Sequence, residues 1–506
     1  MALVREAVIV GQIIVTEPDL VLAQTVPDGG WADPAASGVS VALVATPGGG
    51  LRVQVGAGTV LSRVMLRWRQ AIPRGVLILG DAWERSYGEL QWRSMQPERV
   101  LPWSVLWHDR ASGTTSGWGV EVRGGAFACW TLDPAGVTLW LDLRSGGSPV
   151  RPGDRLITAA VVRSVTSDRS PFAVQGELMA LLCPDPLPVG PLVGANNWYY
   201  AYGRNFDAAA VVRDARTVAD LVGDHPVRPF GVVDDGWTMQ GTADGRIASG
   251  GPWDTGRPVE FPDLPGVAAA IAEQGVRPGI WFRPLLYRTE PRTGSLGPRD
   301  GAFALDPSST ATLETVFADV SRIREWGFEL IKHDFSTYDV FGQWGPTMAA
   351  GPGQNGWSLA DPTVTSAEAL VGLYRTIGAA AGSSIVLGCN VIGHLAAGLV
   401  EAQRTGDDTS GKHWGRTRRV GVNTLAFRLA QHRRFFALDA DCVPSTHQTP
   451  WARNRQFLDL IARSGTALFV SVIQRPGPTP WTPICRPHSA WPWTAATRRE
   501  SSRSTG

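Results

Sequence analysis

Residues 313–335 read LETVFADVSRIREWGFELIKHDF, a helical pattern that runs directly into a short apolar strand. In its first half, apolar side chains recur at the 3.6-residue spacing of a helix with one buried face: Leu313, Val316, Phe317, Val320 and Ile323. The following residues, Phe328–Asp334, have the composition of a buried strand. A helix that leads into a buried strand is the unit from which parallel α/β sheets are built.

The same alternation of helix and strand extends from about Gly194 to Val472. Val211, Ala215, Val218 and Val222 form the apolar stripe of one predicted helix, and other helices are predicted over 395–402 and 422–436. Eight strands are predicted: Val193–Tyr200, Phe230–Asp234, Gly279–Phe282, Phe328–Asp334, Ile385–Asn390, Gln403–Gly406, Ala437–Asp441 and Thr466–Val472. An open doubly wound sheet can also be built from such units. Eight successive units over about 280 residues nevertheless favour a (β/α)8 TIM barrel, which we place at residues 189–475.

The residues before the barrel have a different pattern. Residues 1–188 consist of short period-two apolar runs separated by Gly and Pro, which is typical of an all-β region. We therefore expect an N-terminal β-sandwich, so that the fold class is α/β plus all-β. Residues 476–506 are rich in Trp, Pro, Arg and Ser, have no clear fold, and are expected to be a disordered or truncated tail.

Composition excludes several functional classes. The 506 residues carry a net charge of +1, and only 18% of them are charged, so that a nucleic-acid partner is not expected. No apolar run approaches the roughly 18 residues of a membrane span, and the first 20 residues do not resemble a secretory signal. We expect a cytoplasmic protein. Its five cysteines are widely spaced, which argues against disulfides or a thiolate zinc site.

Carboxylates follow several of the predicted strands. Asp234 and Asp235 end the second strand, and Asp334 ends the fourth. Asp407 and Asp408 follow the sixth strand. One aspartate after a strand is more often a helix cap or a turn residue than a catalyst. Because active sites of barrels lie at the carboxyl ends of their strands, several such residues together indicate a catalytic site.

The fourth strand contains one of only two lysines in the chain, Lys332. Period two places Lys332 on the same face as Asp334, where its charge is expected to keep that carboxylate ionised. The alternative is a structural ion pair. His333 has the opposite parity and is expected to pack against the helix layer.

The sixth strand ends in Arg404-Thr405-Gly406-Asp407-Asp408, and parity groups Arg404 with Asp408. This pattern favours Asp408 as the functional carboxylate and Asp407 as a turn or supporting residue. Two carboxylates from facing strands, one a nucleophile and one an acid/base, are what retaining glycoside hydrolysis requires.

Five motifs, in order along the chain, resemble those of the melibiase-type α-galactosidases of glycoside hydrolase families 36 and 27: Val233-Asp234-Asp235-Gly236-Trp237, Phe261-Pro262-Asp263, Gly279-Ile280-Trp281-Phe282, Leu330 to Phe335 and Arg404 to Thr409. The resemblance covers about residues 190–445. It implies a retaining α-glycosidase on a (β/α)8 barrel, with no metal or organic cofactor and often with an N-terminal β-sandwich.

The resemblance also implies roles for individual residues. Asp334 matches the nucleophile and Asp408 the acid/base. The other matched positions bind the sugar: Lys332 and Arg404 as donors to hydroxyls, Asp234 and Asp235 as acceptors, Trp198 and Trp281 as stacking aromatics, and Cys389 as a residue lining the site. Core packing is the alternative role for the two tryptophans, and a small buried residue is the alternative for Cys389.

The sequence departs from the family pattern at two places. Arg283 stands where many bacterial members have a glutamate, and the residues after Cys389 read Asn390-Val391-Ile392-Gly393-His394 rather than a glycine-rich stretch. Arg283 either lines the rim, where it would favour an acidic sugar or unusual leaving group, or forms a salt bridge. The loop Ser336–Thr365 is expected to form a subsite wall or to be a silent insertion.

The expected substrate is an oligosaccharide or glycoside with a terminal α-galactosyl residue. Two alternatives stay within enzymes, namely a different α-linked sugar and transglycosylation. A third is a degenerate barrel that binds sugar without turnover. A metal-dependent lyase or isomerase is disfavoured, because Lys332 and Arg404 would repel a cation beside the aspartates.

Overall fold

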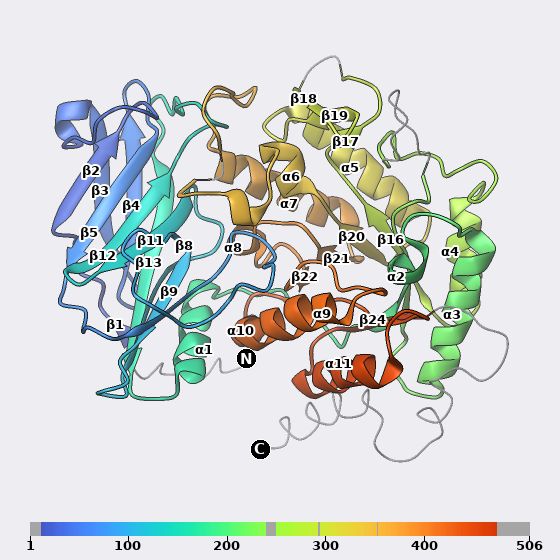
Figure 1. Ribbon diagram of the computed structural model, residues 1–506. Helices are drawn as coiled ribbons and strands as arrows, with labels where there is room; N and C mark the ends of the chain where they lie inside the picture. Colours follow the sequence, from blue (N-terminus) through green and yellow to red (C-terminus); the bar gives the residue numbers. More distant parts are fainter. Residues whose placement is uncertain (1–11, 239–248, 292–293, 352, 473–506) are drawn as a thin grey trace, which may run out of the picture. The chain divides into compact units, whose positions relative to one another are not determined.

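The computed structural model describes residues 12–238, 249–291, 294–351 and 353–472 (Figure 1). The chain divides into two compact units. Unit 1 comprises Met1–Trp83, Leu90–Asp185 and Thr347–Val371. Unit 2 comprises Glu84–Glu89, Pro186–Pro346 and Gly372–Gly506. The predicted domain boundary at residue 188 stays a prediction. Two segments differ from the sequence layout: Glu84–Glu89 groups with unit 2, and Thr347–Val371 groups with unit 1.

Unit 1 contains two antiparallel sheets, as expected for an all-β region. The larger is made of β1 (Gln12–Ile13), β3 (Val39–Thr46), β4 (Gly50–Ala57), β6 (Leu77–Gly80), β7 (Arg93–Ser94), β9 (Ser104–His108), β10 (Thr115–Val120) and β13 (Ile157–Ser167). The smaller is made of β2 (Leu20–Gln24), β5 (Arg63–Arg69), β8 (Leu101–Pro102), β11 (Phe127–Asp133) and β12 (Gly136–Asp142).

Tryptophan side chains from the two sheets of unit 1 are in contact. The ring of Trp118, in the larger sheet, lies 5.1 Å from Trp68 and 5.9 Å from Trp130 of the smaller sheet. The region also contains a helix that the strand pattern did not predict, α1 (Pro171–Leu182). Ser170 caps this helix by accepting from the Ala173 amide, and Pro171 occupies its first turn, where no amide donor is needed.

Unit 2 is built on one parallel sheet of nine strands: β14 (Val193–Asn196), β15 (Phe230–Val233), β16 (Arg277–Phe282), β20 (Leu330–His333), β21 (Ile385–Gly388), β22 (Ala402–Arg404), β23 (Ala437–Asp439), β24 (Val443–Ser445) and β25 (Leu468–Val472). Each of the eight predicted strand segments overlaps one of these strands, and β24 was not predicted. The pairing order runs β23-β22-β21-β20-β16-β15-β14-β25-β24. Because β23 and β24 are separated only by residues 440–442, the sheet curls back to its starting point, as in a TIM barrel.

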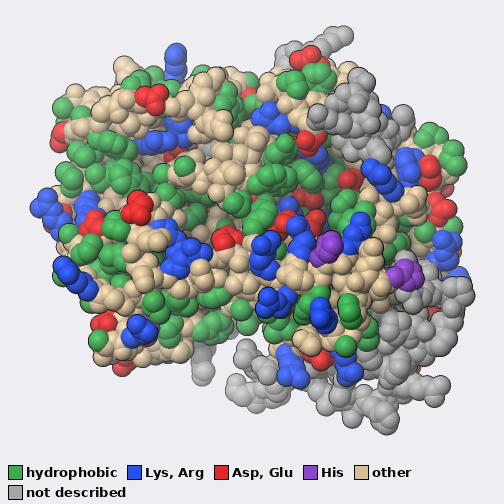
Figure 2. All heavy atoms as spheres, viewed as in Figure 1, with side chains coloured by type: hydrophobic (Ala, Val, Ile, Leu, Met, Phe, Trp, Pro, Cys, Tyr) green, Lys and Arg blue, Asp and Glu red, His purple; other side chains and the backbone are tan. Residues whose placement is uncertain are grey.

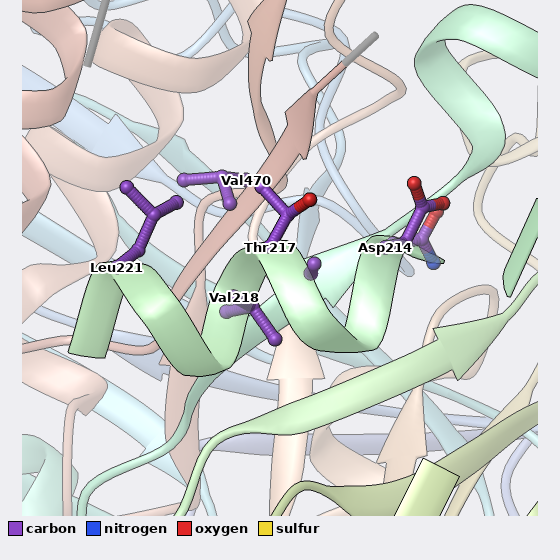
Figure 3. A pocket seen from close by; sticks show the side chains of 7 residues that line it. Asp214, Thr217, Val218, Leu221 and Val470 are labelled. Carbon is purple, nitrogen blue, oxygen red and sulfur yellow. The ribbon is translucent and has the colours of Figure 1, made fainter. Parts of the chain in front are cut away.

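Helices between the strands of unit 2 cover the sheet: α3 (Ala208–Val222), α4 (Leu264–Ala272), α5 (Thr310–Glu325), α7 (Ser366–Ala381) and α11 (Trp451–Ser464). Asp207 caps α3 by accepting from the Ala210 amide at 2.7 Å. The predicted stripe of α3 buries Val211, Ala215 and Val218. Figure 3 shows this helix beside β25, where a small pocket is lined by Thr217, Val218, Leu221 and Val470 among others.

Shorter elements complete unit 2. They are α2 (Trp198–Ala201), α6 (Ser336–Phe341), α8 (Gly393–Ala396), α9 (Trp414–Thr417), α10 (Thr424–Arg428) and a small antiparallel sheet of β17 (Leu286–Tyr287), β18 (Ser295–Arg299) and β19 (Ala302–Leu305). The helices predicted at 395–402 and 422–436 are therefore much shorter or irregular. The predicted loop 336–365 begins with α6, and its part from Thr347 onward belongs to unit 1.

The predicted tail, residues 476–506, lies outside the described residues. Among the residues that are described, no helix has the length and apolar character needed to cross a membrane.

Candidate active site

The predicted site residues lie at the carboxyl ends of the unit 2 strands. Asp234 directly follows β15, Asp334 directly follows β20, and Arg404 is the last residue of β22. Parallel strands of a curled sheet bring their carboxyl ends to one edge. The edge therefore gathers side chains that are up to 200 residues apart in the chain.

Lys332 forms an ion pair with Asp234, with 2.7 Å between Nζ and Oδ2. The expected partner was Asp334, and the structure corrects this expectation. Inward side chains of alternate barrel strands share a layer, so that Lys332 on β20 reaches the residue after β15. Burial lowers the pKa of Lys332, but the surrounding acidic groups, Asp234 above all and then Cys389 and Asp334, together hold it well above its usual value. Asn196 also donates to Asp234.

The neighbouring Asp235 is held differently. Its carboxylate accepts a hydrogen bond from the Ser249 hydroxyl, and its amide donates to Asp234 Oδ1 at 2.8 Å. Loss of water contacts raises the pKa of Asp235 to about 6, and the nearby charge of Asp234 acts in the same direction. The two neighbouring carboxylates thus have different partners, an ammonium for Asp234 and a hydroxyl for Asp235.

Asp334 is buried and accepts two hydrogen bonds from neutral donors. Trp281 Nε1 donates to Oδ2 at 3.1 Å, and the Phe335 amide donates to Oδ1 at 2.8 Å. Its own amide donates to the carbonyl of Phe282 at 3.0 Å. Phe335 has a left-handed backbone, with φ of 63°, which turns the chain sharply after the strand. These contacts fix the direction of the Asp334 carboxylate.

The two predicted stacking aromatics differ in burial. Trp281 is 2% exposed, and its indole donates to Asp334, a role of orienting a carboxylate that was not considered. Trp198 is half-buried at the start of α2, packs against the buried core, and contacts the Tyr202 ring at 5.7 Å. A sugar contact of Trp198 stays a prediction.

Asp408 lies between two guanidinium groups. Arg404 Nη2 donates to Oδ1 at 3.2 Å, and Arg85 Nη1 donates to the same oxygen at 3.3 Å. The Asp408 side chain is 34% exposed, so that a ligand can reach it. Desolvation raises the pKa of Asp408, but Arg85 and then Arg404 outweigh this effect and lower it to about 2.

Asp407, the neighbour of Asp408, contacts the same guanidinium of Arg85, so that the preference for Asp408 as the functional carboxylate stays a prediction. Asp407 pairs with Arg416 and with Arg85 Nη2, the latter at 3.2 Å, and its amide donates to the carbonyl of Ser86 at 2.8 Å. Figure 2 shows blue Lys and Arg side chains over the region where Figure 1 draws α9, the helix that contains Arg416.

Arg404 and Cys389 form the floor between these groups. Arg404 is 1% exposed and pairs with Asp441 at 2.9 Å in addition to Asp408. Its Nη1 also lies 3.5 Å from the Cys389 sulfur. Burial and the nearby charge of Asp334 raise the pKa of Cys389 well above its usual value, so that the thiol is neutral.

Two residues singled out by the sequence lie outside the reacting groups. Arg283 is buried and pairs with Asp339 and, at 2.8 Å, with Asp300. The salt bridge was the correct alternative for this residue. His333 is fully buried beside the Tyr374 ring, as its parity predicts, and burial lowers its pKa to about 4.

Sequence reasoning missed the segment Glu84–Glu89, which supplies Arg85 to this site. Glu84 is fully buried and accepts from Tyr87 Oη at 2.7 Å, from the Gly345 amide at 2.8 Å and from the Asn390 side chain. Burial raises the pKa of Glu84 to about 6. The available signal was a run of charged and aromatic residues, Trp83-Glu84-Arg85-Ser86-Tyr87, within a region otherwise made of strands.

The arrangement offers two carboxylates in contrasting surroundings. Asp334 is oriented by neutral donors, and Asp408 is flanked by cations and partly exposed. Such a difference between two carboxyl groups is typical of acid, base and nucleophile pairs. In the described ranges, no cluster of three or more His, Cys, Asp or Glu is placed to hold a metal ion.

No family model matches the chain. Among solved structures, the α-galactosidase of Thermus thermophilus, in complex with p-nitrophenyl α-D-galactopyranoside, matches with a TM-score of 0.58 and 17% identity over 86% of this chain and 88% of its own. A variant of the family 36 α-galactosidase AgaA of Geobacillus stearothermophilus, in complex with 1-deoxygalactonojirimycin, matches with a TM-score of 0.58 and 15% identity over 96% of this chain and 71% of its own. AgaB of the same organism has a TM-score of 0.57 and 14% identity, over 93% of this chain and 68% of its own. The resemblance expected from the motifs is thus confirmed, and the chain has the fold of the glycoside hydrolase family 36 α-galactosidases.

Proposed function

We propose that this chain is a retaining glycoside hydrolase that removes terminal α-galactosyl residues from oligosaccharides or glycosides. The observation that carries the proposal is the placement of Asp334 and Asp408. Asp334 follows β20 and Asp408 follows β22, so that both lie at the carboxyl ends of strands of the same sheet, in contrasting electrostatic surroundings. The fold shared with α-galactosidases supports this substrate class. We also propose that the two sheets of unit 1 form the N-terminal sandwich and that unit 2 is a (β/α)8 catalytic barrel.

The proposed reaction has two steps. In the first, an Asp334 oxygen attacks the anomeric carbon, the bond from that carbon to the leaving oxygen breaks, and the leaving oxygen takes the proton of Asp408. In the second step, the Asp408 carboxylate takes a proton from water. The water oxygen then bonds to the anomeric carbon as the ester bond to Asp334 breaks, which returns both carboxyl groups to their initial state.

The remaining groups bind the sugar in this proposal. The Lys332 ammonium and the Asp234 carboxylate offer a donor and an acceptor fixed 2.7 Å apart, which suits a pair of adjacent hydroxyl groups. Asp235 supplies a second acceptor. Arg404 and the Cys389 thiol complete the floor, where Arg404 is held by its buried pair with Asp441.

The test is release of nitrophenol from a panel of aryl α- and β-glycosides by the wild type, Asp334→Ala and Asp408→Ala. We expect turnover of the α-galactoside and a loss of at least about a thousandfold in Asp334→Ala, because the nucleophile is removed. Asp408→Ala should keep more activity on substrates with good leaving groups, and azide should restore part of its turnover and yield an α-galactosyl azide, because it replaces water in the second inversion at the anomeric carbon. Asp300→Ala, which alters a carboxylate that pairs only with Arg283 and Tyr338, is the matched control.

Two results would contradict the proposal. Full activity in Asp334→Ala would exclude it as the nucleophile. If the wild type hydrolyses no glycoside of the panel yet binds galactose in calorimetry, the binding-only alternative replaces the enzyme. Added sugar acceptors distinguish hydrolysis from transfer, since a transglycosylase would form mainly a new glycoside.

A further inference from the structure

The segment Glu84–Glu89 is part of unit 2, although the residues on both sides of it in the chain belong to unit 1. Its backbone is joined to the turn after β22. The Ser86 amide donates to the Thr405 carbonyl at 3.1 Å, and the Ser86 carbonyl accepts from the Asp407 amide at 2.8 Å. In addition, Arg428 donates to the carbonyl of Glu84 at 2.6 Å. The position of the segment along the turn is therefore fixed by hydrogen bonds on both sides of Arg85.

Arg85 uses this position to contact both carboxylates of the turn. Its Nη2 lies 3.2 Å from Asp407 Oδ1, and its Nη1 lies 3.3 Å from Asp408 Oδ1. The guanidinium is 7% exposed and is also covered by the Trp344 ring, at 5.4 Å. A planar guanidinium can bridge two carboxylates in this way, whereas the single ammonium of a lysine cannot match both directions.

Arg404, the other cation on Asp408, is held mainly elsewhere. Its closest carboxylate is Asp441, at 2.9 Å, compared with 3.2 Å for Asp408. Arg85, by contrast, has its two carboxylate contacts on the consecutive residues Asp407 and Asp408. The two arginines thus differ in their contacts, because Arg85, unlike Arg404, joins the Asp408 carboxylate to that of Asp407. Arg416 also joins the two residues, but it contacts the carbonyl of Asp408 and not its side chain.

We propose that Arg85 is a positioning residue that clamps Asp407 and Asp408 together and thereby fixes the direction of the Asp408 carboxyl group. The inference rests on the proposed function, in which Asp408 is the acid/base. It assigns a role in catalysis to a residue about 320 positions away in the chain, supplied by a segment that interrupts the all-β region.

Other charged and titratable groups also face Asp408, and they define the background against which Arg85 acts. The cations are Arg404, Lys332 and Arg416, and the neutral or acidic groups are Tyr199, Tyr202, Asp407 and Asp441. Arg85 makes the largest contribution among the groups that lower the pKa of Asp408. Its removal leaves Arg404 in place, so that the pKa should rise without returning to that of an isolated buried carboxyl.

Loss of Arg85 has opposite consequences for the two steps of the reaction. The first step needs protonated Asp408, and a higher pKa extends its activity to higher pH. The second step needs the carboxylate, and a higher pKa removes activity at the acidic end. Both limbs of the pH profile should therefore move upward, by about 1 pH unit or more, which is the usual effect of one opposite charge at this distance.

The experiment compares wild type, Arg85→Gln and Arg277→Gln in the full chain. We expect the alkaline limb of kcat/KM to move upward in Arg85→Gln with an unactivated galactosyl oligosaccharide. The limb should move little with 4-nitrophenyl α-galactoside, since that leaving group needs less acid assistance. Arg277 pairs with Glu329 at 2.7 Å at the opposite end of β16, so that Arg277→Gln should leave both limbs unchanged.

The outcomes separate the inference from the proposed function. A uniform loss of kcat with both substrates and no shift of either limb would assign Arg85 a purely structural role and overturn the inference, while the function would stand. A wild type without α-glycosidase activity would overturn both. If Arg85→Gln does not fold, Arg85→Lys takes its place. A smaller upward shift is then expected, and unmoved limbs would again refute the inference.

Discussion

At the scale of single residues, the carboxylates of the site differ in the kind of group that they contact. Asp334 receives its hydrogen bonds from an indole and an amide, whereas Asp408 is paired with two guanidinium groups and Asp234 with an ammonium. Neutral donors orient a carboxylate without adding a formal charge, which preserves its nucleophilicity. Paired cations instead stabilise the ionised form, which suits a group that must lose its proton in the first step.

The indole of Trp281 is expected to contribute to catalysis through Asp334. In Trp281→Phe the ring is shortened and the donor to Oδ2 is lost, while the smaller aromatic side chain still fills much of the buried space. A hydrogen bond to a charged group is worth about 1.5–3 kcal/mol, so kcat should fall by about tenfold to a hundredfold. Steady-state kinetics with an aryl α-galactoside measures this.

The control for this variant is Trp237→Phe. Trp237 is equally buried and donates to the Trp281 carbonyl at 2.8 Å, so it tests the cost of altering the same aromatic cluster without touching Asp334. Equal losses of kcat in both variants would mean that packing, and not the hydrogen bond to Asp334, is responsible.

Glu84 should make stability depend on pH. Its pKa is raised by burial from 4.5 to about 6, so that the folded protein binds more protons than the unfolded chain between these values. The free energy of unfolding therefore decreases as the pH rises from about 4.5 to 6, by about 2 kcal/mol in total. Glu84→Gln cannot titrate, and its stability relative to wild type should increase by that amount between pH 4 and pH 7.

Urea unfolding midpoints of both proteins, taken at several pH values, measure the Glu84 effect. Glu325→Gln alters an exposed glutamate of the same unit and should show a pH-independent difference from wild type. A difference for Glu84→Gln that stays constant across this pH range would contradict the raised pKa.

Parity along a strand predicted the site better at some residues than at others. It correctly separated His333, which packs beside the Tyr374 ring, from Lys332, because alternation is a local property of the strand. The preference for Asp408 over Asp407 stays a prediction, since both carboxylates contact Arg85. It assigned Lys332 the wrong partner, since a long side chain in a barrel interior can reach across to another strand. Contacts of that kind depend on the closure of the sheet, which no local pattern contains.

At the scale of elements, the turns after the strands determine where the carboxylates point. Gly236 follows the Asp234–Asp235 pair with φ of 110°, and a Cβ at this position would lie 2.6 Å from the Gly203 carbonyl oxygen. Both the backbone conformation and the close approach require glycine. The turn is thus pressed against a neighbouring loop, and this contact limits how the pair can move.

Gly236→Ala is therefore expected to displace Asp234 and Asp235. We expect a loss of stability well above the roughly 1 kcal/mol cost of a left-handed alanine, together with an increase in KM for the galactoside. The matched control is Gly275→Ala, where φ is 75° but an added Cβ would meet nothing within 4 Å. Thermal unfolding and KM are the measurements, and equal effects of both substitutions would exclude the close approach as the cause.

Strands were predicted more accurately than helices in unit 2. Buried strands consist of short apolar runs that resemble one another. Each predicted strand segment overlaps a strand of the structure. The segment 422–436 was predicted as one helix, yet it contains a π-helical stretch, α10 and a 3-10 turn. This region packs against the segment Glu84–Glu89, where Arg428 donates to the Glu84 carbonyl. The irregular backbone thus coincides with contacts to a distant part of the chain, which the local sequence pattern does not contain.

At the scale of the whole molecule, the segment Glu84–Glu89 makes the barrel site dependent on residues that lie among the strands of unit 1 in the sequence. No spacing or periodicity could have revealed this, because the contacts join residues more than 300 positions apart. The family resemblance covered about residues 190–445 and therefore also omitted the segment.

Replacing residues 84–89 by six residues of glycine and serine in the full chain should affect unit 2 and spare unit 1. The replacement removes one hydrogen-bonding partner from each of Asn390, Arg428 and Asp407, and each lost contact of a buried polar group costs about 1–3 kcal/mol. Hydrogen exchange should accelerate in peptides covering 386–392 and 404–409. Exchange in β3 and β4 should not change, since both strands pair within unit 1.

The control replaces residues 109–114, a largely exposed loop between β9 and β10, with the same linker. If the 84–89 replacement leaves exchange at 386–392 and 404–409 as slow as in this control, the segment is an accessory of unit 1, and the barrel maintains its acid/base turn without it.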